Sequence, residues 1–167
     1  QAAKPNIVYV LADDLGYGDV SSYNPGSQVQ TAHLDALAAA GMRFTNAHTA
    51  SGVCSPTRYS IMTGDHPIRI GREKQYQLQY DDSWFKNNPT KTVAEMLKAQ
   101  GYQTGYVGKW HLGYNVFKAD GSAFGKKPAT SQSNKPDWSK GIQDHPYHHG
   151  FEYAFGHTSS NDIPPYK

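Results

Sequence analysis

A short apolar run, Ile7 to Ala12, ends on two adjacent carboxylates, Asp13 and Asp14, and constrains the fold more than any other feature. Because the run is continuous and rich in β-branched residues, it predicts a strand that is covered on both faces, as in a parallel sheet. The following Leu15-Gly16 continues a turn. In open α/β sheets, ligands gather at the carboxyl ends of strands, so this strand end is a candidate site.

Helix and strand patterns alternate along the rest of the chain. Apolar spacing predicts helices over 33–40, 55–62 and 92–100 and strands over 42–48 and 102–107. The last helix has the clearest boundaries, because Thr92 and Glu95 are spaced as a capping box and Gly101 follows as a stop signal. Strands that alternate with helices predict an α/β fold with a mainly parallel sheet flanked by helices.

Two stretches, 72–89 and 118–144, lack a helical or strand period and are predicted loop insertions. Four aromatic side chains mark the first of them: Tyr76, Tyr80, Trp84 and Phe85. Long loops on a compact α/β frame are often binding loops, so these rings are candidates to stack on sugars. Aromatic loop residues pack internally at least as often, which leaves both interpretations open.

Composition excludes several classes of protein. The chain has 16 basic and 14 acidic residues and no stripe of Lys or Arg, which argues against nucleic-acid binding. No apolar run approaches the roughly 20 residues of a membrane-spanning helix, so we expect no membrane span and a soluble protein. The 167 residues suit one domain, and a single cysteine excludes an internal disulfide framework. The chain begins without Met or a signal sequence, as a mature end or an arbitrary boundary does.

Asp13 and Asp14 allow two interpretations. Adjacent carboxylates repel each other unless a cation neutralises them, and their hard oxygen ligands suit Ca²⁺ or Mg²⁺. Asp-rich turns are also common on solvated surfaces, and the two residues taken alone favour this second interpretation.

The segment Cys54-Ser55-Pro56-Thr57-Arg58 opens a predicted helix. Pro56 fits the first helical turn, and Cys54 would then face free N–H groups and the positive end of the helix dipole. This environment activates a thiol and favours a bound anion, and Arg58 lies one turn further along the same face. A buried cysteine beside a structural arginine fits the spacing equally well.

Lys109 and His111 follow the predicted strand over 102–107. In extended geometry residues two apart point to the same side, and a cation beside an imidazole suits anion binding with acid–base work. Two surface polar residues on either side of a packed Trp110 are the alternative.

Four histidines between His145 and His157 suggest a metal cluster at first sight. Their spacing matches no standard zinc pattern, and the chain has no second cysteine to complete one. We therefore predict solvated or supporting histidines and assign no transition metal.

Together these motifs resemble the sulfatase family. The Cys-x-Pro-x-Arg pattern at 54–58, with Met-Thr-Gly after it, is similar to the first signature of that family, and 101–113 is similar to the second. Residues 5–16 are similar to its opening strand, and the segments 149–152 and 160–162 match less specifically. The resemblance implies an alkaline-phosphatase-like α/β fold, of which residues 1–167 form the amino-terminal portion of the catalytic domain.

The sequence departs from the family pattern in three places. Thr57 stands where Ser is usual, Ala32-His33 where Pro-Asn is usual, and Glu152 where Asp is common. Thr57 keeps the hydroxyl, and the change at 32–33 is structural. Members of the family also use an Asp–Asn pair, another His and another Lys from the second half of their longer sequences. We therefore expect residues 1–167 to be inactive by themselves.

The resemblance implies a covalent mechanism in which a maturation enzyme oxidises Cys54 to formylglycine. Its hydrate is a geminal diol: one hydroxyl attacks sulfur, and the second later loses a proton, which expels sulfate and restores the aldehyde. His111 would hydrogen-bond the second hydroxyl and assist its deprotonation. A sulfated thiol has no comparable route of release.

The resemblance also implies how charge is held in the site. Asp13, Asp14 and the modified Cys54 would ligate Ca²⁺. Arg58 and Lys109 would neutralise the diol and the sulfate as the S–O bond breaks.

A sulfated carbohydrate is the expected substrate, with Ser160 close to it, and the expected location is periplasmic or secreted. Two alternatives stay open. A phosphonate or phosphodiester hydrolase of the same superfamily would use the same site on a tetrahedral phosphorus. A binding protein in which Cys54 stays a thiol would hold sulfated glycans without turnover.

Overall fold

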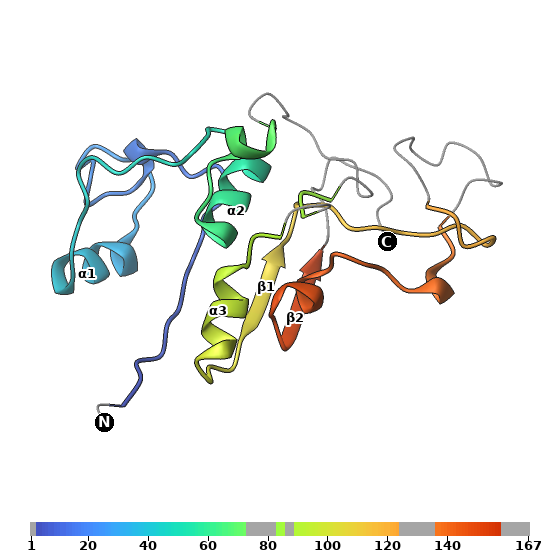
Figure 1. Ribbon diagram of the computed structural model, residues 1–167. Helices are drawn as coiled ribbons and strands as arrows, with labels where there is room; N and C mark the ends of the chain where they lie inside the picture. Colours follow the sequence, from blue (N-terminus) through green and yellow to red (C-terminus); the bar gives the residue numbers. More distant parts are fainter. Residues whose placement is uncertain (1–2, 73–82, 86–88, 124–135, 158–167) are drawn as a thin grey trace. The chain divides into compact units, whose positions relative to one another are not determined.

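The computed structural model describes residues 3–72, 83–85, 89–123 and 136–157 (Figure 1). It divides into two compact units, Gln1–His48 and Thr49–Lys167. No helix in the described part of the chain combines the length and the apolar character needed to cross a bilayer.

The first unit contains helix α1 (Ala32–Ala40) and a short 3-10 helix η1 (Tyr17–Asp19). The carboxylate of Asp35 organises it, because it accepts hydrogen bonds from the Ser21 hydroxyl at 2.6 Å, the Ser22 amide at 2.8 Å and the Thr31 hydroxyl at 3.1 Å. These bonds, that of Ser21 above all, lower the pKa of Asp35. The helix predicted over 33–40 is thus confirmed and starts one residue earlier.

The two strands predicted in the first unit are wrong. Residues 7–12 are extended but form no strand, and Val8 and Val10 are 85% and 83% exposed. Residues 42–48 form no strand either. A β-strand needs a neighbouring strand whose backbone hydrogen-bonds its N–H and C=O groups. Among the described residues, no segment pairs with either stretch.

Where the structure describes it, the second unit combines two α-helices with a parallel sheet. Helix α2 spans Cys54–Thr63, α3 spans Val93–Ala99, and strands β1 (Gly105–Lys109) and β2 (Tyr153–His157) pair in parallel (Figure 1). The strand predicted over 102–107 is confirmed, shifted toward the carboxyl end. Strand β2 was not predicted, although Tyr153 and Phe155 alternate with small residues as strand residues do.

Local chemistry sets the helix ends. Thr92 caps α3: its hydroxyl accepts from the Glu95 amide at 3.2 Å, while the Glu95 carboxylate accepts from the Thr92 amide at 2.7 Å, which confirms the capping box. Helix α2 begins at Cys54, one residue before the predicted start, and ends at Thr63, with Gly64 as its C-cap. Gly64 has a φ of +73°, a left-handed conformation that suits glycine at a helix end.

Aromatic residues dominate the core of the second unit. The buried cluster contains Tyr59, Trp84, Phe85, Ala94, Trp110, Leu112 and Phe151. Trp84 is 1% exposed, and its ring lies 5.5 Å from that of Tyr59. Trp84 and Phe85 are therefore packing residues, which settles that alternative for these two rings, whereas Tyr76 and Tyr80 lie outside the described residues. The described part of this unit also contains the 3-10 helices η2 (Pro67–Ile70), η4 (Trp138–Lys140) and η5 (Pro146–His149).

Candidate active site

Cys54 and His111 meet in the second unit. Sγ of Cys54, the first residue of α2, lies 3.1 Å from Nδ1 of His111, which follows β1. Cys54 is partly buried and His111 is 3% exposed. The cysteine therefore sits at a helix start beside an imidazole, within hydrogen-bonding distance across more than fifty positions of sequence.

The backbone of His111 is strained. Its φ is +52°, and among the described non-glycine residues only Asp14, His111 and Asp144 have a positive φ. The Ser55 hydroxyl holds this turn by donating to the His111 carbonyl at 2.8 Å. The extended geometry expected from Lys109 to His111 is therefore not kept, since β1 ends at Lys109 and the backbone turns at His111. Strain of this kind persists only where surrounding contacts enforce it, and it clusters at functional sites.

Arg58 links α2 to the end of β1. It is 8% exposed, and its Nη1 donates to the carbonyl oxygen of Lys109 and, at 3.4 Å, to the hydroxyl of Tyr106. Of the four residues that the sequence assigned to catalysis, the structure thus pairs the side chains of Cys54 and His111 and joins Arg58 to the backbone carbonyl of Lys109. Tyr106 was not predicted, although its place on the same strand as Lys109 was a usable signal.

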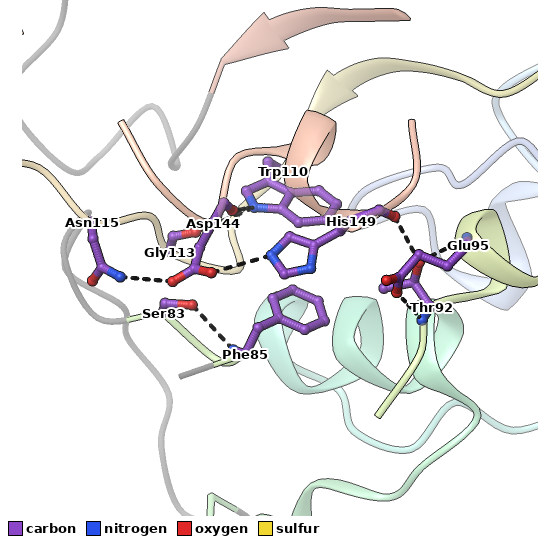
Figure 2. A network of polar contacts seen from close by, with 9 residues as sticks. All are labelled: Ser83, Phe85, Thr92, Glu95, Trp110, Gly113, Asn115, Asp144 and His149. Carbon is purple, nitrogen blue, oxygen red and sulfur yellow. Dashed lines mark hydrogen bonds and ion pairs between the residues drawn. The ribbon is translucent and has the colours of Figure 1, made fainter. Parts of the chain in front are cut away.

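Trp110, between Lys109 and His111, is fixed by a partly buried polar network (Figure 2). Its indole nitrogen donates to the carbonyls of Gly113 and Asp144, each at 3.2 Å. Its ring stacks on His149 at 5.9 Å, and Nε2 of His149 lies 3.5 Å from the carboxylate of Asp144. These two hydrogen bonds and the stacking on His149 anchor the backbone between Lys109 and His111.

Asp144 is the charged centre of this network. The adjacent His149 is the main cause of a lowered pKa for Asp144, and Asn115 donates to the same carboxylate at 2.7 Å. Burial lowers the pKa of His145. Within the described ranges, no group of three or more His, Cys, Asp or Glu side chains is arranged to hold a metal ion. His149 supports Trp110, in line with the supporting role predicted for these histidines.

Asp13 and Asp14 lie in the first unit. Both are exposed, and Asp14 has a φ of +60°. Two adjacent carboxylates suit the hard oxygen chemistry of Ca²⁺, which takes six to eight oxygen ligands, so they fit part of such a site and need further donors. Because Cys54 belongs to the second unit, its convergence with the two aspartates stays a prediction, and Ser160 lies outside the described residues.

Comparison with known sequences identifies the family. The family model described as Sulfatase matches residues 5–165. Arylsulfatase H of Homo sapiens is 36% identical over 159 residues, which are 92% of this chain and 25% of that protein. The N-acetylgalactosamine-6-O-sulfatase of Bacteroides thetaiotaomicron is 44% identical over 110 residues, which are 66% of this chain and 21% of that relative. The chain thus spans a quarter or less of the length of these relatives.

Solved structures are similar to this chain in fold as well as in sequence. One from work on glycosaminoglycan metabolism by Bacteroides thetaiotaomicron has a TM-score of 0.72 at 36% identity, covering 97% of this chain and 30% of that one. A crystal structure of Ps i-CgsB in complex with k-i-k-neocarrahexaose has a TM-score of 0.67 at 30% identity, covering 95% and 29%. The predicted alkaline-phosphatase-like α/β fold is confirmed. The chain belongs to the sulfatase family.

Proposed function

We propose that the protein hydrolyses sulfuric esters at a site built around Cys54 and His111. The observation that carries the proposal is the 3.1 Å contact between Cys54 Sγ and His111 Nδ1 at the start of α2, in a chain of the sulfatase family. A helix start favours an anion, because its backbone N–H groups and dipole present positive charge. A sulfate ester is such an anion.

Oxidation of Cys54 to formylglycine by a maturation enzyme would supply a hydrated aldehyde, a nucleophile with its own route of sulfate release. His111 is placed to act on that side chain, since Nδ1 already lies within hydrogen-bonding distance of the atom attached to Cβ of residue 54. Its imidazole would orient residue 54 and accept a proton at Nδ1. The Ser55 hydroxyl would hold the imidazole in place through the His111 carbonyl.

Positive charge would come from Arg58 and Lys109. Arg58 lies one helical turn beyond Cys54, and its guanidinium is buried, so its attraction for an anion is little screened by water. Lys109 is joined to Arg58 through its own backbone carbonyl. Two cations beside residue 54 would neutralise the sulfate group as the S–O bond breaks.

Asp13 and Asp14 would hold a calcium ion together with the modified Cys54 and donors beyond those described. The ion would supply further positive charge for the sulfate oxygens. The carboxylates themselves would serve to bind it, and the left-handed backbone at Asp14 would set the angle between them.

For the substrate we propose a sulfated carbohydrate, with Ser160 near it. The support comes from relatives: one is named an N-acetylgalactosamine-6-O-sulfatase, and one similar structure is described with k-i-k-neocarrahexaose bound. Trp84 and Phe85 do not contribute, because both are buried. A periplasmic or secreted location is part of the same proposal.

The test compares three substrates with the complete, calcium-loaded protein after maturation of Cys54. We expect sulfate release from a sulfated oligosaccharide to be fastest, with slower release from a small aryl sulfate and little hydrolysis of a phosphodiester. Cleavage of aryl sulfates alone would contradict the carbohydrate assignment. If the phosphodiester is hydrolysed faster than the sulfate esters, the protein is a phosphodiester hydrolase and not a sulfatase. If it binds sulfated glycans without hydrolysing them, it is a binding protein.

A further inference from the structure

We infer that Tyr106 is a positioning residue that fixes the guanidinium of Arg58 beside the Lys109–His111 segment; this inference rests on the proposed function. Tyr106 lies on β1, three residues before Lys109. Its hydroxyl donates to the Lys109 carbonyl, and Nη1 of Arg58 donates to that carbonyl and, at 3.4 Å, to the hydroxyl of Tyr106. The three groups close a triangle of hydrogen bonds between α2 and β1.

Burial of Arg58 makes this triangle important. Only 8% of Arg58 is exposed, and a buried guanidinium is stable only where its N–H donors meet acceptors. Because the guanidinium is rigid and planar, anchoring one terminal nitrogen fixes the direction of the whole fork. An anion held beside Cys54, one helical turn away, would therefore meet donors whose direction Tyr106 helps to set.

The ring of Tyr106 has a separate role. It packs edge-on against Trp110, with centroids 5.3 Å apart and planes at 89°, and it contacts Phe151 at 5.2 Å. Phenylalanine at this position would keep both ring contacts and remove only the hydroxyl. Tyr106→Phe therefore separates positioning of Arg58 from packing of the core.

The experiment uses the complete protein after maturation of Cys54, with inorganic sulfate as the probe in calorimetry and a small aryl sulfate as the substrate. We expect Tyr106→Phe to weaken sulfate binding about tenfold and to lower kcat/KM about tenfold, because a hydrogen bond to a charged group is lost. The matched control is Tyr147→Phe, which removes a hydroxyl from an exposed tyrosine that donates to the Ala154 carbonyl at 3.5 Å. That variant should equal the wild type in both measurements.

A double variant tests whether Tyr106 acts through Arg58. Lysine at position 58 has no planar fork to orient, so adding Tyr106→Phe to Arg58→Lys should change sulfate affinity by less than about twofold. A full tenfold loss in that background would overturn the inference. So would an unchanged sulfate affinity in Tyr106→Phe accompanied by a lower melting temperature, since Tyr106 would then only support packing.

The two readouts separate this inference from the proposed function. If the wild type binds sulfate but hydrolyses no sulfuric ester, the proposed function is wrong, and sulfate affinity still decides the role of Tyr106. If the wild type is an active sulfatase and Tyr106→Phe matches it, the inference alone is wrong. A wild type that neither binds sulfate nor hydrolyses its esters overturns both.

Discussion

The two units of the chain differ in how they hold their candidate site residues. None of residues 3–48, all of which the structure describes, is buried, and Asp13 and Asp14 follow an exposed apolar run. In the second unit, Arg58 and His111 are buried beside an aromatic core. The first unit presents carboxylates on a surface turn, whereas the second holds its cations and imidazole in fixed geometry.

This difference teaches which parts of a site a chain can organise by itself. The second unit contains both partners of each important contact, such as Cys54 with His111 and Arg58 with Lys109. The first unit contains the hydrogen-bond donors for its own carboxylate Asp35, namely the Ser21 hydroxyl and the Ser22 amide. Its apolar run has no such partner among the described residues.

The largest effect should come from Cys54, at the centre of the second unit's site. Cys54→Ala removes the proposed nucleophile, and we expect kcat to fall by at least about 10⁴-fold in the complete protein, as for other enzymes that lose a nucleophile. The measurement is sulfate release from an aryl sulfate. Folding is checked by an unchanged melting temperature, and residual activity within about tenfold of wild type would show that Cys54 is not the nucleophile.

Next come the carboxylates of the first unit. Asp14→Ala should abolish calcium binding measured by calorimetry and lower activity about 10³-fold, because the remaining ligands hold a divalent ion poorly. Asp120→Ala, at an exposed aspartate of the second unit, is the matched control and should bind calcium normally. Calcium binding retained in Asp14→Ala would remove the first unit from the site.

Core packing of the second unit gives the third prediction. Trp84→Ala should lower the free energy of unfolding by about 3–5 kcal/mol, because Trp84 is 1% exposed and fills the aromatic cluster. Trp138, which is 51% exposed, supplies the control, and Trp138→Ala should stay within about 0.5 kcal/mol of wild type. Urea denaturation compares the two, and equal losses would contradict the position of the core.

Thr92 tests the helix cap. Its buried hydroxyl both caps α3 and donates to the His149 carbonyl at 2.6 Å. Thr92→Ala should therefore cost about 2 kcal/mol of unfolding free energy. Thr92→Ser keeps the hydroxyl and should recover most of this loss in the same urea denaturation; no recovery would mean that the methyl group, not the hydroxyl, stabilises the cap.

The smallest effect concerns Asp144. Its pKa is lowered in the folded state by His149 first, with Ser83 and His148 adding to the effect, so the ionised carboxylate stabilises the fold above its unfolded pKa. That stability, about 1 kcal/mol, is lost as pH falls through the lower folded pKa. Melting temperatures of wild type and Asp144→Asn should therefore differ at neutral pH and converge once the pH falls below the usual range of an aspartate. A constant difference across this range would refute the ionic contribution.

Sequence reasoning succeeded where the signal is local. The capping box of Thr92 and Glu95 and the start of helix α2 depend on neighbouring residues; the box is found as predicted, and the helix starts within one residue of its predicted start. The prediction failed where the structure of a segment depends on a distant partner: residues 7–12 can form a strand only beside a neighbouring strand. The left-handed turn at His111 depends on Ser55, more than fifty residues away, so it too could not be derived from local spacing.

The sequence predicted which residues form the candidate site, but it did not predict the residues that hold them in place. The four catalytic candidates follow from two short motifs. Tyr106 contacts Arg58, and the pair Asp144–His149 supports Trp110, through contacts that no local spacing reveals. Such supports come from folded geometry, because a tyrosine on a strand and a histidine in a loop have many other common roles.

The mass of the tryptic peptide Phe44–Arg58, which contains Cys54, tests the central claim most directly. In catalytically active protein isolated from its native organism, we predict the mass of the aldehyde and its hydrate at residue 54. A free thiol at that residue in fully active protein would contradict the account, because the proposed chemistry has no other nucleophile.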